Sequence, residues 1–176
     1  MWTVVDSPIG ELRLVEHDGA VTAIEFAPFP AVVRPPRPDG AAPGAAPEDA
    51  PEDAPGRDDD RPVLVETAAQ LAAYFAGDLT RFDLPLAPVG TPFQQKVWAA
   101  LAEIPYGATT SYGAVARALG LTGHGSRAVG LANGRNPVPV VVPCHRVVGA
   151  DGSLTGYAGG VERKQALLDL EQGALF

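Results

Sequence analysis

Hydrophobic and polar residues alternate along the first 27 residues of the chain. The apolar positions fall two apart in three short runs, and turn-forming sequences separate these runs at residues 7–10 and 17–19. Alternation with a period of two is typical of strands that bury one face. The pattern therefore predicts an antiparallel meander of three short strands within residues 2–27.

The hydrophobic period becomes helical further along the chain. Apolar residues recur three or four apart over residues 63–76, and Gly77 follows them as a helix stop. Thr91 and Ser111 are good N-cap residues, so each predicts a helix behind it. Two more helices are predicted over 126–134 and 163–171, and the short apolar run 140–142 is interpreted as a buried strand.

Taken together, these elements predict a mixed α/β (α+β) protein with two domains. The first, residues 1–88, combines the small antiparallel sheet with a helix. The second, residues 89–176, is mostly helical, and its short helices at 111–120 and 126–134, joined by a Gly-containing turn, predict a winged-helix-like helix-turn-helix. Residues 34–62 are rich in Pro, Ala, Gly and Asp, and we predict that this acidic insertion is disordered because it offers few side chains to bury.

The chain has a formal net charge of −8, but the charge is unevenly distributed. Residues 91–176 carry seven basic and five acidic side chains, and the stretch 104–150 contains arginines but no Asp or Glu. A stretch that contains arginines but no acidic side chains is a candidate surface for binding phosphate groups. No membrane span or leader pattern is present, and one cysteine suits a reducing compartment, so we expect a cytoplasmic protein.

Cys144 is the only cysteine, so it cannot form an internal disulfide or a multi-cysteine metal site. His145 follows it directly, and Arg135 and Arg146 lie within ten residues. Because nearby cations and a hydrogen-bonded histidine lower the pKa of a thiol, this setting predicts an activated nucleophile.

A series of short motifs from Thr91 to Glu171, about half the chain, resembles the catalytic domain of the 6-O-alkylguanine-DNA alkyltransferases. The motifs occur in the order and at close to the spacings of that family. They are Phe93-Gln94 with Val97-Trp98, Ile104-Pro105-Tyr106-Gly107, Thr110-Ser111-Tyr112, Ser126-Arg127-Ala128-Val129-Gly130, Asn136-Pro137, Pro143-Cys144-His145-Arg146-Val147, Gly156-Tyr157-Ala158-Gly159-Gly160 and Lys164.

The resemblance implies a DNA-repair protein that transfers an alkyl group from the O6 of guanine, or the O4 of thymine, irreversibly to Cys144. His145 would then take the thiol proton, through a water in the family, and Glu171 would hold the imidazole. Tyr112 would protonate the leaving guanine, and Asn136 would tie the recognition helix to the cysteine loop.

The resemblance also implies that the target base is flipped out of the duplex from the minor groove. Arg127 would fill the vacated stack, beside the small residues Ala128 and Gly130, and Arg135 would contact phosphate. The other residues carried over to substrate and DNA binding are Phe93, Gln94, Tyr157, Ala158 and Lys164. Some relatives have a serine where this chain has Ala158, so recognition by the backbone near Tyr157 would have to compensate.

No cofactor is implied, because the substrate carries the transferred group. Some relatives bind zinc in the N-terminal domain, but this chain offers only His17 there, so no metal is expected. The expected partner is double-stranded DNA containing O6-alkylguanine, bound by a monomer without membrane association. Two alternatives remain open: a non-catalytic sensor of alkylated DNA, and a cysteine hydrolase using Cys144 and His145.

Overall fold

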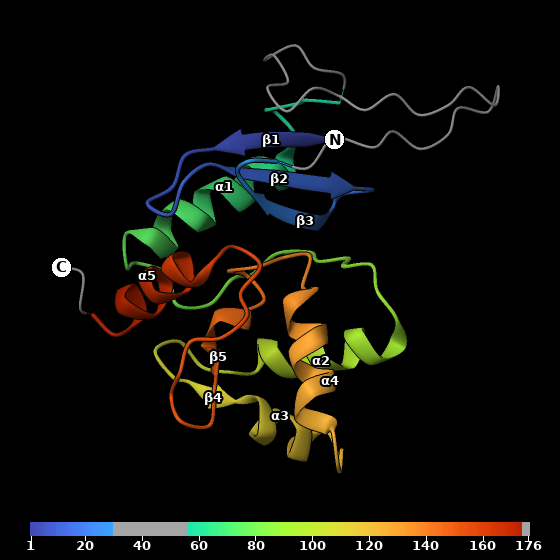
Figure 1. Cartoon of the computed structure of the whole chain (residues 1–176). Helices are drawn as coiled ribbons and strands as arrows, with labels where there is room; N and C mark the ends of the chain where they lie inside the picture. Colours follow the sequence, from blue (N-terminus) through green and yellow to red (C-terminus); the bar gives the residue numbers. More distant parts are fainter. Residues whose placement is uncertain (30–55, 174–176) are drawn as a thin grey trace.

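A computed structural model describes residues 1–29 and 56–173 of the chain (Figure 1). Its N-terminal sheet contains β1 (Trp2–Val5), β2 (Leu12–His17) and β3 (Ala20–Phe26) in the order β1-β2-β3, with antiparallel pairing throughout. Leu14 is opposite Thr3 in β1 and opposite Ile24 in β3. The structure thus confirms the predicted meander of three strands.

Helix α1 (Pro62–Phe75) packs against all three strands of this sheet. Its buried face includes Leu64, Leu71 and Tyr74, at the helical spacing seen in the sequence. Gly77 follows the helix with a φ of 81°, a conformation in which glycine avoids the strain that a Cβ would bring. The helix and its end were therefore predictable from the pattern.

The predicted disorder is wrong for residues 56–62, while 34–55 lie outside the described residues. The backbone of Trp2 donates to the Gly56 carbonyl at 2.9 Å and accepts from the Asp58 amide at 2.9 Å, which pairs this segment with β1. Arg61 then binds the buried carboxylate of Glu16 just before α1 begins. These residues are ordered by backbone pairing and by two ion pairs, Arg57–Asp59 and Arg61–Glu16, which an argument from composition does not consider.

The C-terminal half contains α2 (Pro92–Ala102), α3 (Tyr112–Ala118) and α4 (Gly125–Gly134). Thr91 and Gln94 cap α2 reciprocally, and the Ser111 hydroxyl accepts from an amide in the first turn of α3. Helices α3 and α4 pack together as a helix-turn-helix, which confirms the predicted motif. The short strands β4 (Thr110–Ser111) and β5 (Val147–Val148) pair in parallel beside it.

The predicted strand over residues 140–142 is wrong. Val140 has a φ of 72°, and the Val142 amide donates to the Val138 carbonyl at 2.9 Å, so the chain turns here. A short apolar run between prolines marks burial but does not distinguish a strand from a buried turn. Positive φ is strained for a β-branched residue such as Val140. The turn leads directly into the short 3-10 helix η1 (Cys144–Arg146).

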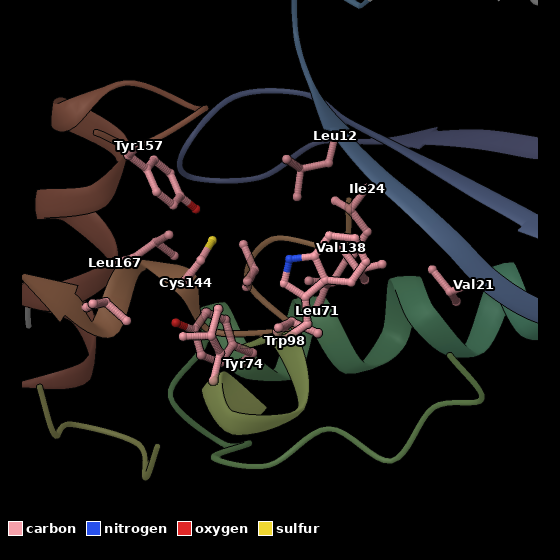
Figure 2. Packing of buried hydrophobic residues seen from close by; sticks show 14 of the residues in the cluster. Leu12, Val21, Ile24, Leu71, Tyr74, Trp98, Val138, Cys144, Tyr157 and Leu167 are labelled. Carbon is pink, nitrogen blue, oxygen red and sulfur yellow. The ribbon is translucent and has the colours of Figure 1, made fainter. Parts of the chain in front are cut away.

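The two halves of the chain share one hydrophobic core, which extends from the sheet to the region of Cys144 (Figure 2). The backbone amide of Ile24 in β3 donates to the Pro137 carbonyl at 2.8 Å, beside the end of α4. The last helix, α5 (Val161–Glu171), lies beside α1 (Figure 1), and Tyr74 of α1 bonds to Glu171. The N-terminal half therefore directly supports the segments around the cysteine.

Candidate active site

Cys144 begins η1 at the end of the buried turn, and 3% of its surface is exposed. Its amide donates to the Val142 carbonyl at 2.8 Å, and its own carbonyl accepts from the Asn133 side chain at 3.4 Å. Figure 2 shows the sulfur of Cys144 pointing toward the hydroxyl end of Tyr157. The thiol is therefore held in a fixed direction inside the protein.

The expectation that neighbouring cations lower the pKa of Cys144 is wrong. Burial raises the pKa of this thiol to about 11, although the Asn136 side chain and Lys164 act in the opposite direction. The Arg146 guanidinium bonds to Glu171, and the Arg135 side chain is exposed. At neutral pH the resting protein holds Cys144 as a thiol, so a base must remove its proton before attack.

His145 follows Cys144 in η1 and is completely buried. Its Nε2 lies 2.8 Å from Oε1 of Glu171, while Nδ1 has no hydrogen-bond partner among the described residues. Burial lowers the pKa of His145, although Glu171 opposes this effect. A neutral imidazole that donates from Nε2 to a carboxylate must carry its lone pair on Nδ1. The geometry therefore leaves Nδ1 free to accept a proton.

Glu171, near the end of α5, is the centre of a buried hydrogen-bond network. Arg146 donates to both carboxylate oxygens, at 2.9 Å from Nε and 2.8 Å from NH2. Tyr74 donates to Oε1 at 2.7 Å, and the Gly107 amide donates to Oε2 at 3.1 Å. Burial would raise the pKa of Glu171, but hydrogen bonds from His145 and Arg146 outweigh it and lower the pKa to about 2. The carboxylate is therefore ionised at neutral pH and holds the His145 ring.

Asn136 connects the end of α4 to the turn that carries Cys144. Its Nδ2 donates to the Val142 carbonyl at 2.8 Å, and its Oδ1 accepts from the Val138 amide at 3.0 Å. With Asn133 bonded to the Cys144 carbonyl, two side chains near the C-terminal end of α4 hold this turn. A shift of α4 would therefore be transmitted to the cysteine.

Tyr112 and Lys164 meet at the carbonyl of Thr155. The Tyr112 hydroxyl donates to it at 3.0 Å, and Lys164 Nζ donates at 3.1 Å and also reaches the Val147 carbonyl at 2.6 Å. Lys164 is completely buried, and its ammonium lies 5.8 Å from the centre of the Tyr112 ring. Burial raises the pKa of Tyr112 and lowers that of Lys164. Lys164 thus fixes the loop around Thr155.

A surface cavity of about 540 Å³ lies between the helix-turn-helix and this loop. Arg127 and Gly130 of α4 line it together with Tyr112, Thr155 and Gly156. Arg127 is exposed at the start of α4, and a Cβ on Gly130 would lie 3.8 Å from the Tyr112 ring. A Cβ at this position would therefore make an ordinary van der Waals contact with the Tyr112 ring.

The remaining predicted site residues lie in several places. Ala128 is half-buried on α4, and Ala158 is exposed beside the buried Tyr157. Phe93 packs against the core, and Gln94 accepts from the Thr91 amide at 2.8 Å. Gln94 is thus engaged in capping α2, the helix that also contacts η1.

Comparisons with known proteins agree with this arrangement. The model of the DNA-binding domain of 6-O-methylguanine DNA methyltransferase matches residues 92–173, and that of its ribonuclease-like domain matches residues 1–88. The methylated-DNA–protein-cysteine methyltransferase of Mycobacterium tuberculosis is 46% identical over 171 residues, which cover 97% of this chain and 92% of the relative. The chain belongs to the 6-O-methylguanine DNA methyltransferase family.

Further relatives extend this likeness to solved structures and to archaea. The crystal structure of M. tuberculosis OGT in complex with DNA has a TM-score of 0.77 at 43% identity, covering 98% of this chain and 93% of that one. The methylated-DNA–protein-cysteine methyltransferase of Methanosarcina acetivorans is 59% identical over 106 residues, 60% of this chain and 67% of the relative.

In this methyltransferase-family chain, sequence reasoning missed several residues that support the site. The sequence predicts Arg146 as a cation near the thiol, but in the structure its guanidinium pairs with Glu171. The spacing of Tyr74 predicts a place on the core face of its helix and gives no sign of a polar partner 97 positions away. Asn133 lies on the buried face of α4, and its position in the sequence gives no sign of its bond to the Cys144 carbonyl.

Two kinds of feature are absent from the described residues. Within 1–29 and 56–173, no helix is long and apolar enough to cross a membrane. The same residues contain no group of three or more His, Cys, Asp or Glu side chains that could hold a metal ion.

Proposed function

We propose that this chain repairs double-stranded DNA by transferring an alkyl group from the O6 of guanine to Cys144, once per molecule. The observation that carries the proposal is the array Cys144, His145 and Glu171, in which an ionised carboxylate holds a neutral imidazole next to the cysteine. The relatives named as methylated-DNA–protein-cysteine methyltransferases, and the DNA complex of one of them, support the same reaction.

The first step is activation of the thiol. Because the pKa of Cys144 is about 11, few molecules hold a thiolate at neutral pH. Nδ1 of His145 accepts the proton, directly or through a bridging water molecule, and the positive ring that forms is stabilised by Glu171. Arg146 and Tyr74 keep the carboxylate in place during this transfer.

The second step is displacement at the alkyl carbon. The Cys144 thiolate forms a carbon–sulfur bond as the carbon–oxygen bond to guanine breaks, and the bonding pair remains with the base. Tyr112 supplies a proton to the leaving guanine, which avoids the release of a bare anion. The thioether product is stable, and since nothing removes the alkyl group, the protein acts once.

The target atom is enclosed in a stacked duplex, so the base must turn out of the helix to reach Cys144. The cavity beside Tyr112 opens at the start of α4, where the exposed Arg127 can fill the vacated stack from the minor groove. Arg135, exposed at the end of the same helix, is placed for a phosphate contact.

Mass spectrometry after reaction with a duplex oligonucleotide carrying one O6-methylguanine tests the proposal. We expect one added methyl group on the peptide that contains Cys144, none with an unmodified duplex, and none in Cys144→Ser, which should still bind DNA. Binding without an adduct would instead indicate a damage sensor, and release of a modified product with turnover would indicate a hydrolase. A duplex carrying O4-methylthymine tests the second substrate in the same way.

Arg127→Ala tests base flipping separately from the chemistry. We expect it to slow transfer from the duplex far more than transfer from free O6-methylguanine. Arg117→Ala removes the same charge from the exposed end of α3 and is the matched control. Equal slowing on both substrates would assign Arg127 to structure or to the chemical step.

A further inference from the structure

The hydroxyl of Tyr157 is a buried donor next to the reactive sulfur. Only 8% of Tyr157 is exposed, and its hydroxyl has no hydrogen-bond partner among the described residues. Figure 2 shows this hydroxyl directed toward the sulfur of Cys144. A buried polar group without a partner is costly in a folded protein, so its retention beside a nucleophile requires a reason.

The ring of Tyr157 is held from the other half of the molecule. Phe26, the last residue of β3, contacts it with 5.8 Å between ring centroids and a tilt of 56°. A Cβ on Gly159 would lie 2.8 Å from Phe26 Cε2 and 2.9 Å from Tyr157 Cε1. The two rings therefore close over the backbone of Gly159, where no side chain fits.

Arg163 holds the N-terminal sheet and the loop before α5 together. Its guanidinium donates to the carbonyls of Ile9 at 2.7 Å, Ala27 at 3.1 Å and Gly159 at 3.1 Å. The same group lies 5.2 Å from the centre of the Phe26 ring. The turn before β2, the end of β3 and the loop of Tyr157 are thus joined at one residue, which limits the freedom of both rings.

We infer that Phe26 is a positioning residue that holds the phenol of Tyr157 against Cys144, so that its hydroxyl donates to the sulfur as the thiolate forms. This inference rests on the proposed function for its chemical context. A hydrogen bond is stronger when its acceptor is charged than when the acceptor is neutral. The Tyr157 hydroxyl therefore stabilises the thiolate of Cys144 more than it stabilises the thiol. The N-terminal sheet thereby contributes to the chemical step.

Other groups around Cys144 are already engaged. Lys164 of α5 donates to two carbonyls, and the Tyr112 hydroxyl of α3 donates to Thr155. His145 in η1 is the proposed base. Burial and the neighbouring Cys144 raise the pKa of Tyr157 well above its ordinary value, so it remains a protonated donor.

The test measures two rates in each variant: alkylation of Cys144 by iodoacetamide, which needs no DNA, and methyl transfer from the O6-methylguanine duplex. Tyr157→Phe and Phe26→Ala should each slow both reactions about ten-fold at neutral pH, since each removes a hydrogen bond to a charged group. Phe26→Tyr keeps an aromatic ring at this position, so both of its rates should be about those of the wild type. The double variant should be no slower than Tyr157→Phe alone, because both changes act on one interaction.

Val21→Ala is the matched control, because it removes buried apolar volume from the same strand away from Tyr157. It should lower thermal stability and leave both rates unchanged. The inference is overturned if Phe26→Ala behaves like Val21→Ala, or if the effects of Phe26→Ala and Tyr157→Phe multiply. A wild-type protein that reacts with iodoacetamide but not with the duplex would overturn the proposed function instead, and the iodoacetamide series would still decide the role of Phe26.

Discussion

Tyr74 of α1 donates a 2.7 Å hydrogen bond to the carboxylate of Glu171 in α5, across 97 positions of sequence. The oxygen that it contacts is the one that faces His145. Burial and the nearby carboxylate raise the pKa of Tyr74, so it remains a protonated donor at neutral pH. A residue of the N-terminal half therefore belongs to the network that orients the proposed base.

Tyr74→Phe should remove this bond while preserving the ring packing. Because the acceptor is charged, we expect a loss of about 1.5–3 kcal/mol in the free energy of unfolding, together with slower methyl transfer. Urea unfolding and single-turnover transfer measure the two effects. Tyr106→Phe is the control, since Tyr106 packs against Tyr74 and Arg146 through its ring. An equal loss in both variants would contradict a specific role for the Tyr74 bond.

Acid should destabilise the protein through Glu171. Its pKa in the folded state, about 2, is lower than its ordinary value of 4.5, so its contribution to stability is complete above about pH 5 and is lost as the pH falls toward 2. Glu171→Gln should therefore lack this part of the acid dependence. At neutral pH it should be less stable by about 3–5 kcal/mol, because Arg146 loses its partner in a buried pair.

Urea unfolding at a series of pH values compares this variant with the wild type. The two curves should run parallel above about pH 5 and converge as the wild type loses the contribution of Glu171. Curves that remain parallel down to low pH would show that protonation of this carboxylate is not part of acid unfolding.

The sequence predicted those elements whose signals are local. Alternation is a property of neighbouring residues and predicted the meander, and Thr91 and Ser111 act on amides within their own first turn. The turn over 140–142 was not predictable in this way, because Val140 adopts its positive φ under the constraint of Asn136 and the packing around it.

In the site, too, the features with local signals could be predicted from the sequence and those that depend on tertiary packing could not. Adjacency in sequence placed His145 beside Cys144, and family resemblance suggested Glu171. The direction of the Cys144 pKa shift was predicted wrongly, because burial depends on residues that reach the site from α1, α4 and α5 rather than on the cations nearby in sequence. Long-range partners such as Tyr74 are specified by tertiary packing and have no local signal.

Gly125 permits the close approach of α4 to the preceding helix. A Cβ there would lie 2.7 Å from the Leu121 Cβ and 3.3 Å from the Ala116 Cβ. Gly125→Ala should therefore destabilise the protein by about 1–3 kcal/mol through overpacking. Gly134→Ala, at the other end of α4 with open space around it, should be neutral or stabilising by up to about 1 kcal/mol. Thermal unfolding of both variants checks the contrast, and a stabilised Gly125→Ala would contradict the packing argument.

The pH dependence of methyl transfer should reveal the base. If His145 removes the proton in the reacting complex, the active form has a neutral imidazole and a thiol. The pKa of His145 is lowered from 6.5 and that of Cys144 is raised to about 11. The form with a neutral imidazole and a thiol therefore dominates at pH values between these two pKa values. The single-turnover rate should therefore be nearly flat from about pH 7 to 9 and fall only at pH values below 6.5, the ordinary pKa of a histidine. Were free thiolate the reacting species without help from His145, the rate would instead rise about ten-fold per pH unit over the same range. His145→Gln removes the base, so its residual rate should show that steep rise, and a flat profile in this variant would assign proton removal to another group.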